Sequence, residues 1–309
     1  MQTQLRKMLV LFLSVQLLGL YVGISLMGIP EFVQTQVTPV EPTNPVNSFI
    51  MLGYVVFGAA FLIALLKFYR GVVLFKLLES AVIFITSNVV FFAILHNFFG
   101  FYISVLASVI FSLLLTMLKF FEPRLKNLTA AISSAGVGAV FGVSLGFIPL
   151  LIFVVGLAIY DIVSVFLTRH MVIMARELSR RQMSFSVSAM GKPSKRDISK
   201  LQPEERKKEE MERTVLELGT GDIAIPLMLA VSAYRLGCTA YVGGVCIFSP
   251  MYGLAHSLIV ICGSAIALFF ILDYVIKEKA FLPALPPIAF GGVASLLLFK
   301  IVEAMVSAF

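Results

Sequence analysis

The chain has 309 residues, of which 59% are hydrophobic and 13% charged, and its mean hydropathy is +0.99. These values exclude a water-soluble globular protein, because soluble domains carry about 25% charged residues. At about 20 apolar residues per crossing, the sequence can supply about eight to ten membrane-spanning helices. A β-barrel would show short alternating segments, whereas the apolar runs here are continuous. We therefore expect an all-α, polytopic membrane protein.

Nine apolar runs, bounded by charged residues, prolines or polar clusters, are predicted to span the membrane. In chain order they cover residues 8–29, 48–66, 77–95, 98–118, 129–146, 148–168, 214–234, 243–272 and 281–305. The fifth and sixth runs are separated by Gly146 and Pro149, which are typical of a tight turn. The expected organisation is six helices in residues 1–175, a polar cytoplasmic connection at 176–213, and three helices in residues 214–309.

Basic residues predict the orientation of these spans. Of the 24 Lys and Arg residues, 22 fall before the first span or around the even-numbered connections, which places them on one side of the membrane. Because basic residues collect in cytoplasmic loops, we expect a multi-pass protein of the cell membrane with a cytoplasmic N-terminus and an outer C-terminus. The formal charge of +7 then reflects topology, and no nucleic-acid partner is expected.

The three cysteines show no spacing typical of a metal site, so neither a metal nor another cofactor is expected. Cys238 and Cys246 flank the predicted outer connection after the seventh span. A disulfide between them is conceivable, but two small buried apolar side chains are the favoured interpretation.

Acidic residues inside a span are costly and point to function. Four acids lie within about one turn of a span end, where water is within reach: Glu79, Glu217, Asp273 and Glu303. Two acids lie deeper. Asp161 precedes Arg169 by eight residues and Asp222 follows Arg213 by nine, so on consecutive antiparallel helices both lie about 12 to 13 Å from the basic boundary.

Two carboxyls at one depth can share a proton, because like charges prevent both from ionising together. That state suits an aspartic protease, in which the ionised acid activates water and the protonated acid polarises the peptide carbonyl. By spacing alone, a proton or ion relay in a channel or transporter remains open. So do two structural acids satisfied by hydroxyl groups.

Small and helix-breaking residues surround the predicted acids. Gly219 and Gly221 remove bulk on either side of Thr220, so that another backbone can approach Asp222. Pro226 leaves the carbonyl of Asp222 without its helical partner. The last span opens with FLPALPP, whose three prolines favour irregular backbone that lines a cavity.

With these motifs the sequence resembles the presenilin and signal peptide peptidase family of intramembrane aspartyl proteases. The resemblance rests on three motifs in this order: Tyr160-Asp161, Gly219-Thr220-Gly221-Asp222 and Pro283-Ala284-Leu285. It implies a presenilin-like fold of nine helices, a catalytic pair formed by Asp161 and Asp222, and transmembrane-helix protein substrates in the lipid bilayer. The Pro283-Ala284-Leu285 turn would shape the site and hold substrate, and Tyr160 would border it.

The sequence departs from the presenilin pattern in three ways. Thr220 stands where presenilins typically have leucine, and Ile223 replaces the aromatic residue that usually follows the motif. The connection at 176–213 is short, which argues against autoproteolytic maturation there. This compactness resembles archaeal homologues, so no obligatory accessory subunit is expected, and the oligomeric state stays open. A channel or proton-coupled transporter using the same acids, and a substrate-binding scaffold without catalysis, are the competing functions.

Overall fold

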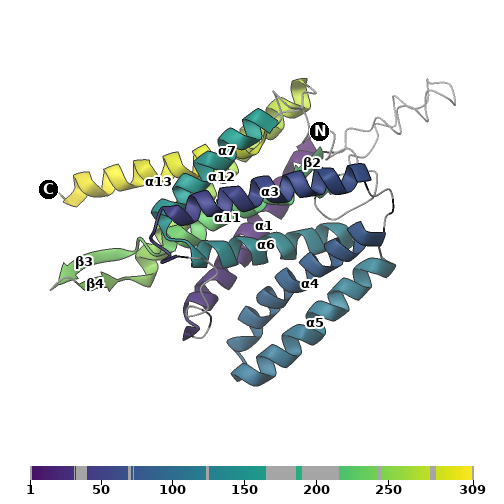
Figure 1. Cartoon of the computed structure of the whole chain (residues 1–309). Helices are drawn as coiled ribbons and strands as arrows, with labels where there is room; N and C mark the ends of the chain where they lie inside the picture. Colours follow the sequence, from purple (N-terminus) through teal and green to yellow (C-terminus); the bar gives the residue numbers. More distant parts are fainter. Residues whose placement is uncertain are drawn as a thin grey trace.

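The computed structural model describes residues 2–30, 32, 40–68, 71, 73–122, 125–164, 186–189, 216–242, 245–278 and 283–307. Within these ranges the chain forms nine helices: α1 (Gln2–Met27), α3 (Val46–Phe68), α4 (Val73–His96), α5 (Phe101–Phe121), α6 (Lys126–Ser144), α7 (Phe147–Ile162), α11 (Thr220–Tyr234), α12 (Pro250–Glu278) and α13 (Leu285–Ser307) (Figure 1). Two small antiparallel sheets pair β1 (Ser186–Ala189) with β2 (Leu216–Gly219), and β3 (Cys238–Val242) with β4 (Val245–Phe248).

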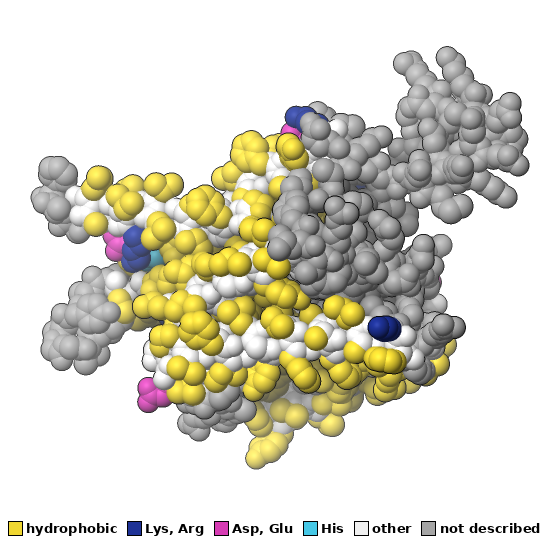
Figure 2. All heavy atoms as spheres, turned by 45° about the horizontal axis from the view of Figure 1, so that its top comes forward, with side chains coloured by type: hydrophobic (Ala, Val, Ile, Leu, Met, Phe, Trp, Pro, Cys, Tyr) yellow, Lys and Arg dark blue, Asp and Glu magenta, His cyan; other side chains and the backbone are white. Residues whose placement is uncertain are grey.

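The expected all-α membrane architecture is confirmed. Each of the nine predicted spans corresponds to one described helix, and seven of the nine are long and apolar enough to cross a membrane. The remaining two, α7 and α11, are apolar but shorter. Figure 2 shows one face of the molecule, on which apolar side chains cover the helices and the few charged side chains lie toward their ends. Such a surface suits a hydrocarbon environment.

Several helix boundaries differ from the predicted spans, including the starts of the last three helices. The seventh span was predicted to begin at 214, but residues 216–219 form β2, and α11 starts only at Thr220. The eighth was predicted to begin at 243, but 245–248 form β4, and α12 starts at Pro250. The last was predicted from 281, and α13 starts at Leu285. Of the predicted connection at 176–213, only β1 lies within the described residues.

The β3–β4 hairpin connects α11 to α12, and its register is irregular between Cys238 and Ala240, at the start of β3. Cys238 is disulfide-bonded, whereas Cys262 on α12 is a free cysteine. The interpretation of Cys238 as a small buried apolar residue is therefore wrong. Tyr234, at the end of α11, packs edge-on against Phe248 with ring centroids 5.2 Å apart, which anchors the hairpin to the helices.

The core of the bundle is α11. Every residue of this helix from Ile223 to Tyr234 is buried, and the helix contacts α1, α6, α7, α12 and α13. A helix that is apolar on all sides needs such a surround. Small residues of α6 allow α11 to approach closely, because a Cβ on Gly142 of α6 would lie 2.7 Å from the Cβ of Val231 on α11.

The α4–α5 pair lies at one edge of the bundle (Figure 1). Toward the rest of the protein α5 presents a stripe of hydroxyl side chains at four-residue spacing: Ser104, Ser108, Ser112 and Thr116. Its opposite face exposes large apolar side chains such as Leu106 and Leu113. Without water to drive apolar surfaces together, membrane helices associate through small and polar residues, and this helix follows that rule.

Candidate active site

The two acids singled out by the sequence lie on α7 and α11, the two helices that are shorter than a membrane span. Asp161 is the penultimate residue of α7 and is 6% exposed. Asp222 lies in the first turn of α11 and is partly exposed. The two helices contact each other, and the two carboxylates interact electrostatically. The fold therefore brings both acids together at the ends of two short helices.

Asp222 is held by the start of its own helix. Gly219 is the N-cap residue, with extended backbone (φ −63°, ψ 143°), and ends β2. Asp222 occupies the third helical position, from which a carboxylate can reach back to the N-cap. The backbone N–H of Gly219 donates a hydrogen bond to it. This contact fixes the carboxylate over the first turn of α11.

The two glycines of the motif have different surroundings. A Cβ on Gly219 would lie 3.1 Å from Oδ2 of Asp222, which is tighter than an ordinary contact. A Cβ on Gly221 would meet nothing within 4 Å, and Gly221 is exposed. Gly219 therefore makes room for the carboxylate of Asp222 itself, whereas Gly221 borders open space beside it.

Asp161 is held by the start of a different helix. Pro283 is buried, Ala284 forms a bend that packs against the core, and Leu285 begins α13. The backbone N–H of Leu285 donates a hydrogen bond to the carboxylate of Asp161. The first N–H groups of a helix have no intrahelical partner and carry partial positive charge, so they bind anions well. The predicted Pro283-Ala284-Leu285 segment thus lies beside Asp161.

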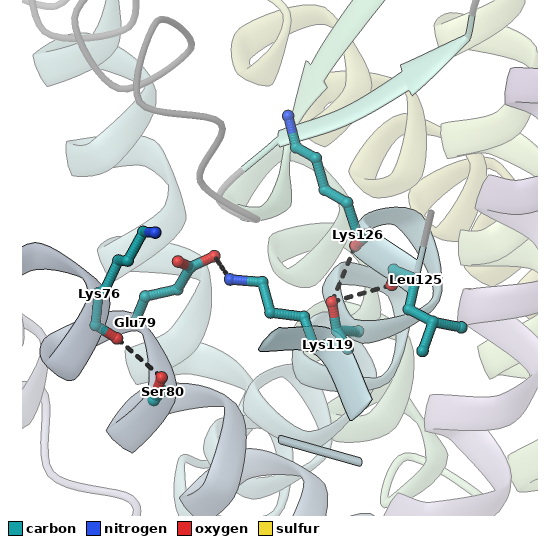
Figure 3. Close-up of polar contacts among 7 residues, drawn as sticks. Lys76, Glu79, Ser80, Lys119, Leu125 and Lys126 are labelled. Carbon is teal, nitrogen blue, oxygen red and sulfur yellow. Dashed lines mark hydrogen bonds and ion pairs between the residues drawn. The ribbon is translucent and has the colours of Figure 1, made fainter. Parts of the chain in front are cut away.

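Three other acids in the described helices have lysine partners. Glu79 of α4, predicted to lie within reach of water, is instead buried, and its Oε1 lies 2.5 Å from Nζ of Lys119 on α5 (Figure 3). Two further acids pair with a lysine of their own helix and are less buried, Asp273 with Lys277 at 2.6 Å and Glu303 with Lys300 at 3.1 Å. The interactions described for the two central acids are instead with backbone N–H groups, with each other and, for Asp161, with Tyr160. Among the described residues neither acid has a lysine or arginine partner that would hold it in its ionised form.

The remaining predicted site residues lie around this pair. Tyr160 is half-buried and interacts electrostatically with Asp161. The backbone carbonyl of Thr220 faces Oγ of Ser134 on α6 at 3.3 Å. Within the described ranges, no three His, Cys, Asp or Glu side chains lie close enough together to hold a metal ion. The chemistry that the site offers is proton transfer by two carboxyls.

One residue near the site was missed by sequence reasoning. Gln16 of α1 is fully buried, and its Nε2 donates a 2.8 Å hydrogen bond to the carbonyl of Ile223, next to Asp222. Gln16 carries no ionisable group, so charge within a span does not single it out. The signal was available, because a single Gln within LFLSVQLLGL must find a hydrogen-bond partner inside the membrane.

Comparisons with known proteins agree with this arrangement. A family model described as signal-peptide peptidase, presenilin aspartyl protease matches residues 9–305. No curated protein matches the chain. Two solved structures are similar in fold, both described as a presenilin family intramembrane aspartate protease. The one in space group C222 has a TM-score of 0.61 at 20% identity, covering 94% of each chain. The one in space group P2 has a TM-score of 0.58 at 22% identity, covering 94% of this chain and 97% of the other.

At these identities the structural matches establish the fold alone, and the expected presenilin-like fold is confirmed. The family model goes further, because it extends over all nine described helices, from within α1 to within α13. The chain therefore belongs to the signal-peptide peptidase and presenilin family of aspartyl proteases.

Proposed function

We propose that the chain hydrolyses peptide bonds within transmembrane helices of its protein substrates, with Asp161 and Asp222 as the catalytic pair. The observation that carries this proposal is the meeting of the two carboxylates from α7 and α11, each bound by a backbone N–H at a helix start. Neighbouring like charges in a poorly solvated site favour one proton shared by the pair.

The shared proton divides the two chemical roles. The ionised carboxylate takes a proton from a water molecule, whose oxygen attacks the carbonyl carbon of the scissile peptide bond. The protonated carboxyl donates to the carbonyl oxygen and thereby stabilises the tetrahedral intermediate. A proton then passes to the peptide nitrogen as the C–N bond breaks. No other ionisable group is required, which fits the N–H donors around each acid.

A substrate helix must unwind to expose its backbone to these acids. We propose that the unwound segment pairs with β2, which runs directly into the Gly219-Thr220-Gly221-Asp222 motif. Within the described residues β2 pairs only with β1, so its second edge offers unpaired backbone groups. Strand addition there would deliver the substrate backbone to the open space beside Gly221.

The proposed orientation places the N-terminus in the cytoplasm. The N-terminus and β2 lie at one end of the bundle, whereas the β3–β4 hairpin and the C-terminus lie at the other (Figure 1). The basic residues favour the first end as cytoplasmic. The disulfide at Cys238 favours the second end as the outer side, because disulfides persist in oxidising compartments.

Cleavage of a single-span substrate by the purified chain tests the proposal. We expect product from the wild type, and none from Asp161→Asn or Asp222→Asn, because neither half of the pair can replace the other. Asp273→Asn is the matched control, since the carboxylate of Asp273 already has the ammonium of Lys277 as its partner and its loss should leave cleavage unchanged.

A transition-state-analogue inhibitor of aspartyl proteases should bind the wild type and block cleavage. Normal cleavage by either single variant would contradict the assigned pair. A folded wild type that neither cuts nor binds the inhibitor would favour ion or proton transport through the same acids. Because the assay contains no protein besides the chain and its substrate, it also tests whether the chain acts without accessory subunits.

A further inference from the structure

The turn of α11 that carries Asp222 accepts a side-chain hydrogen bond from the neighbouring helix α1. Gln16 of α1 is fully buried, and its amide donates to the carbonyl of Ile223, the residue after Asp222. The Oε1 of Gln16 has no hydrogen-bond partner among the described residues. A buried amide whose described bond reaches the backbone of the proposed catalytic turn fixes the position of that turn.

The hydrogen bond from Gln16 lies in the part of α11 that lacks a helical hydrogen bond. Pro226 lies inside the helix and has no N–H to offer the carbonyl of Asp222. One helical hydrogen bond is therefore missing in the turn that carries the acid. The Gln16 amide binds the next carbonyl along this turn, so α1 supplies a polar contact where the helix has lost one of its own. Ser134 contributes less, because its single proton also has the carbonyl of Ala130 at 2.8 Å.

Beyond this contact, toward the C-terminal ends of both helices, α1 and α11 pack closely through glycines of α1. Gly19 and Gly23, one and two turns after Gln16, receive Leu227 and Val231 of α11. A Cβ on Gly23 would lie 2.7 Å from Cγ1 of Val231, so nothing larger than glycine fits. These contacts run in the same order along both helices, so Gln16 forms the end of the series nearest the acid.

Glycines of α6 pack against α11 in the same way. Gly138 and Gly142 pack on the same two side chains, Leu227 and Val231. A Cβ on Gly138 would lie 2.9 Å from the Cβ of Leu227. Glycines on both sides therefore let α1 and α6 pack closely on α11, and the Gln16 amide adds a polar contact at the turn of Asp222.

We propose that Gln16 is a positioning residue that acts through Asp222: its amide bond to the Ile223 carbonyl holds the proline-weakened first turns of α11 so that the carboxylate faces Asp161. This inference rests on the proposed function, because it assumes that Asp222 is one of the two catalytic acids. It makes α1, which carries none of the recognised motifs, part of the apparatus that sets the geometry of the pair.

Gln16→Met tests the inference, because methionine keeps the length and volume of the side chain and removes the donor. We expect kcat for a single-span substrate to fall about 10- to 100-fold, since a displacement of about 1 Å at a reacting group costs about 100-fold. KM should stay within about twofold of wild type, because the fully buried side chain of Gln16 has no exposed surface to offer a substrate.

Gln16→Glu supplies a signature that a merely structural role would not give. A protonated glutamic acid can donate to the Ile223 carbonyl, and an ionised one cannot. The rate of Gln16→Glu relative to wild type at the same pH should therefore rise as pH falls. The corresponding ratio for Gln16→Met should stay flat.

Ser232→Ala is the matched control. Ser232 lies on the same helix, and its Oγ donates to the carbonyl of Leu145 at 3.1 Å, about 15 Å along α11 from Asp222. We expect its kcat to remain within about twofold of wild type. Equal losses in Gln16→Met and Ser232→Ala would overturn the inference, because they would show that any loosening of α11 has the same effect.

A folded Gln16→Met with kcat within about twofold of wild type would also overturn it. If Gln16→Met fails to fold, the pH dependence of Gln16→Glu decides, and a flat ratio would overturn the inference. These results leave wild-type cleavage and its loss in Asp222→Asn intact. A wild type that does not cleave would overturn the proposed function itself, and the two failures are thereby distinguishable.

Discussion

A carboxylate within a membrane protein needs a compensating group, and this chain uses two kinds. Glu79 has the ammonium of Lys119, which neutralises its charge. Asp161 has the N–H of Leu285, and Asp222 has that of Gly219, which stabilise an anion without adding a full positive charge. The first kind of partner braces two helices. The second kind leaves a carboxyl free to gain and lose a proton, as the proposed chemistry requires.

Gly219 and Gly221 should respond differently to alanine. In Gly219→Ala the new methyl group would press on Oδ2 of Asp222, so we expect kcat to fall about 10- to 100-fold. The backbone at Gly219 has negative φ, so the loss would not come from backbone strain. In Gly221→Ala the methyl group enters the open space proposed for substrate, so KM should rise while kcat changes less. Steady-state kinetics on both variants would measure these changes, and thermal unfolding would check that both variants fold. A raised KM in Gly219→Ala together with a lowered kcat in Gly221→Ala would contradict the prediction.

Breaking the Glu79–Lys119 pair should destabilise the fold. Lys119→Leu would leave the carboxylate of Glu79, whose side chain is 3% exposed, without its ammonium partner. We expect a loss of about 3 kcal/mol in unfolding free energy. The double variant Glu79→Leu with Lys119→Leu should recover most of it, because no buried charge remains. A double-mutant cycle on detergent unfolding measures the coupling, and additive losses would show that the pair is not coupled.

At the scale of elements, the long apolar runs of the sequence predict the helices correctly, whereas its short segments do not reveal the strands. Continuous apolar runs predicted the nine helices and placed Asp161 and Asp222 on neighbouring ones. The four-residue strand β2 was absorbed into the predicted seventh span, although Leu216 to Gly219 alternates apolar and other residues. Its strand pairing depends on β1, which is distant in the sequence. The contact of Leu285 with Asp161 likewise comes from tertiary packing of α13 on α7, which no local pattern contains.

Pairing of substrate with β2 gives an element-scale prediction. In a strand added to a sheet edge, alternate residues direct their N–H groups to the neighbouring strand. Proline substituted one position at a time along the substrate segment beside the cleavage site should therefore reduce cleavage with a period of two residues. Measured rates for the series would show this alternation. A loss that declines smoothly with distance from the scissile bond would instead mean that the substrate binds without strand pairing.

At the scale of the whole molecule, the two ends of the bundle serve different compartments. The proposed orientation puts β2 and the start of α11 near the cytoplasmic end, and the β3–β4 hairpin with Cys238 at the outer end. A protease arranged in this way would receive the unwound substrate segment from the cytoplasmic side of the bilayer. The orientation thus decides which end of a substrate can be released into which compartment.

Cysteine labelling in intact cells tests this orientation. In a Cys262→Ser background, Met251→Cys places a thiol at a residue that is 77% exposed in the first turn of α12, next to the hairpin. Gln4→Cys places one near the start of α1, beside Arg6 and Lys7. We expect a membrane-impermeant maleimide to label Met251→Cys in intact cells, and Gln4→Cys only after permeabilisation. If only Gln4→Cys were labelled in intact cells, the orientation would be the opposite of the proposed one. Substrates would then reach the two acids from the other side of the membrane.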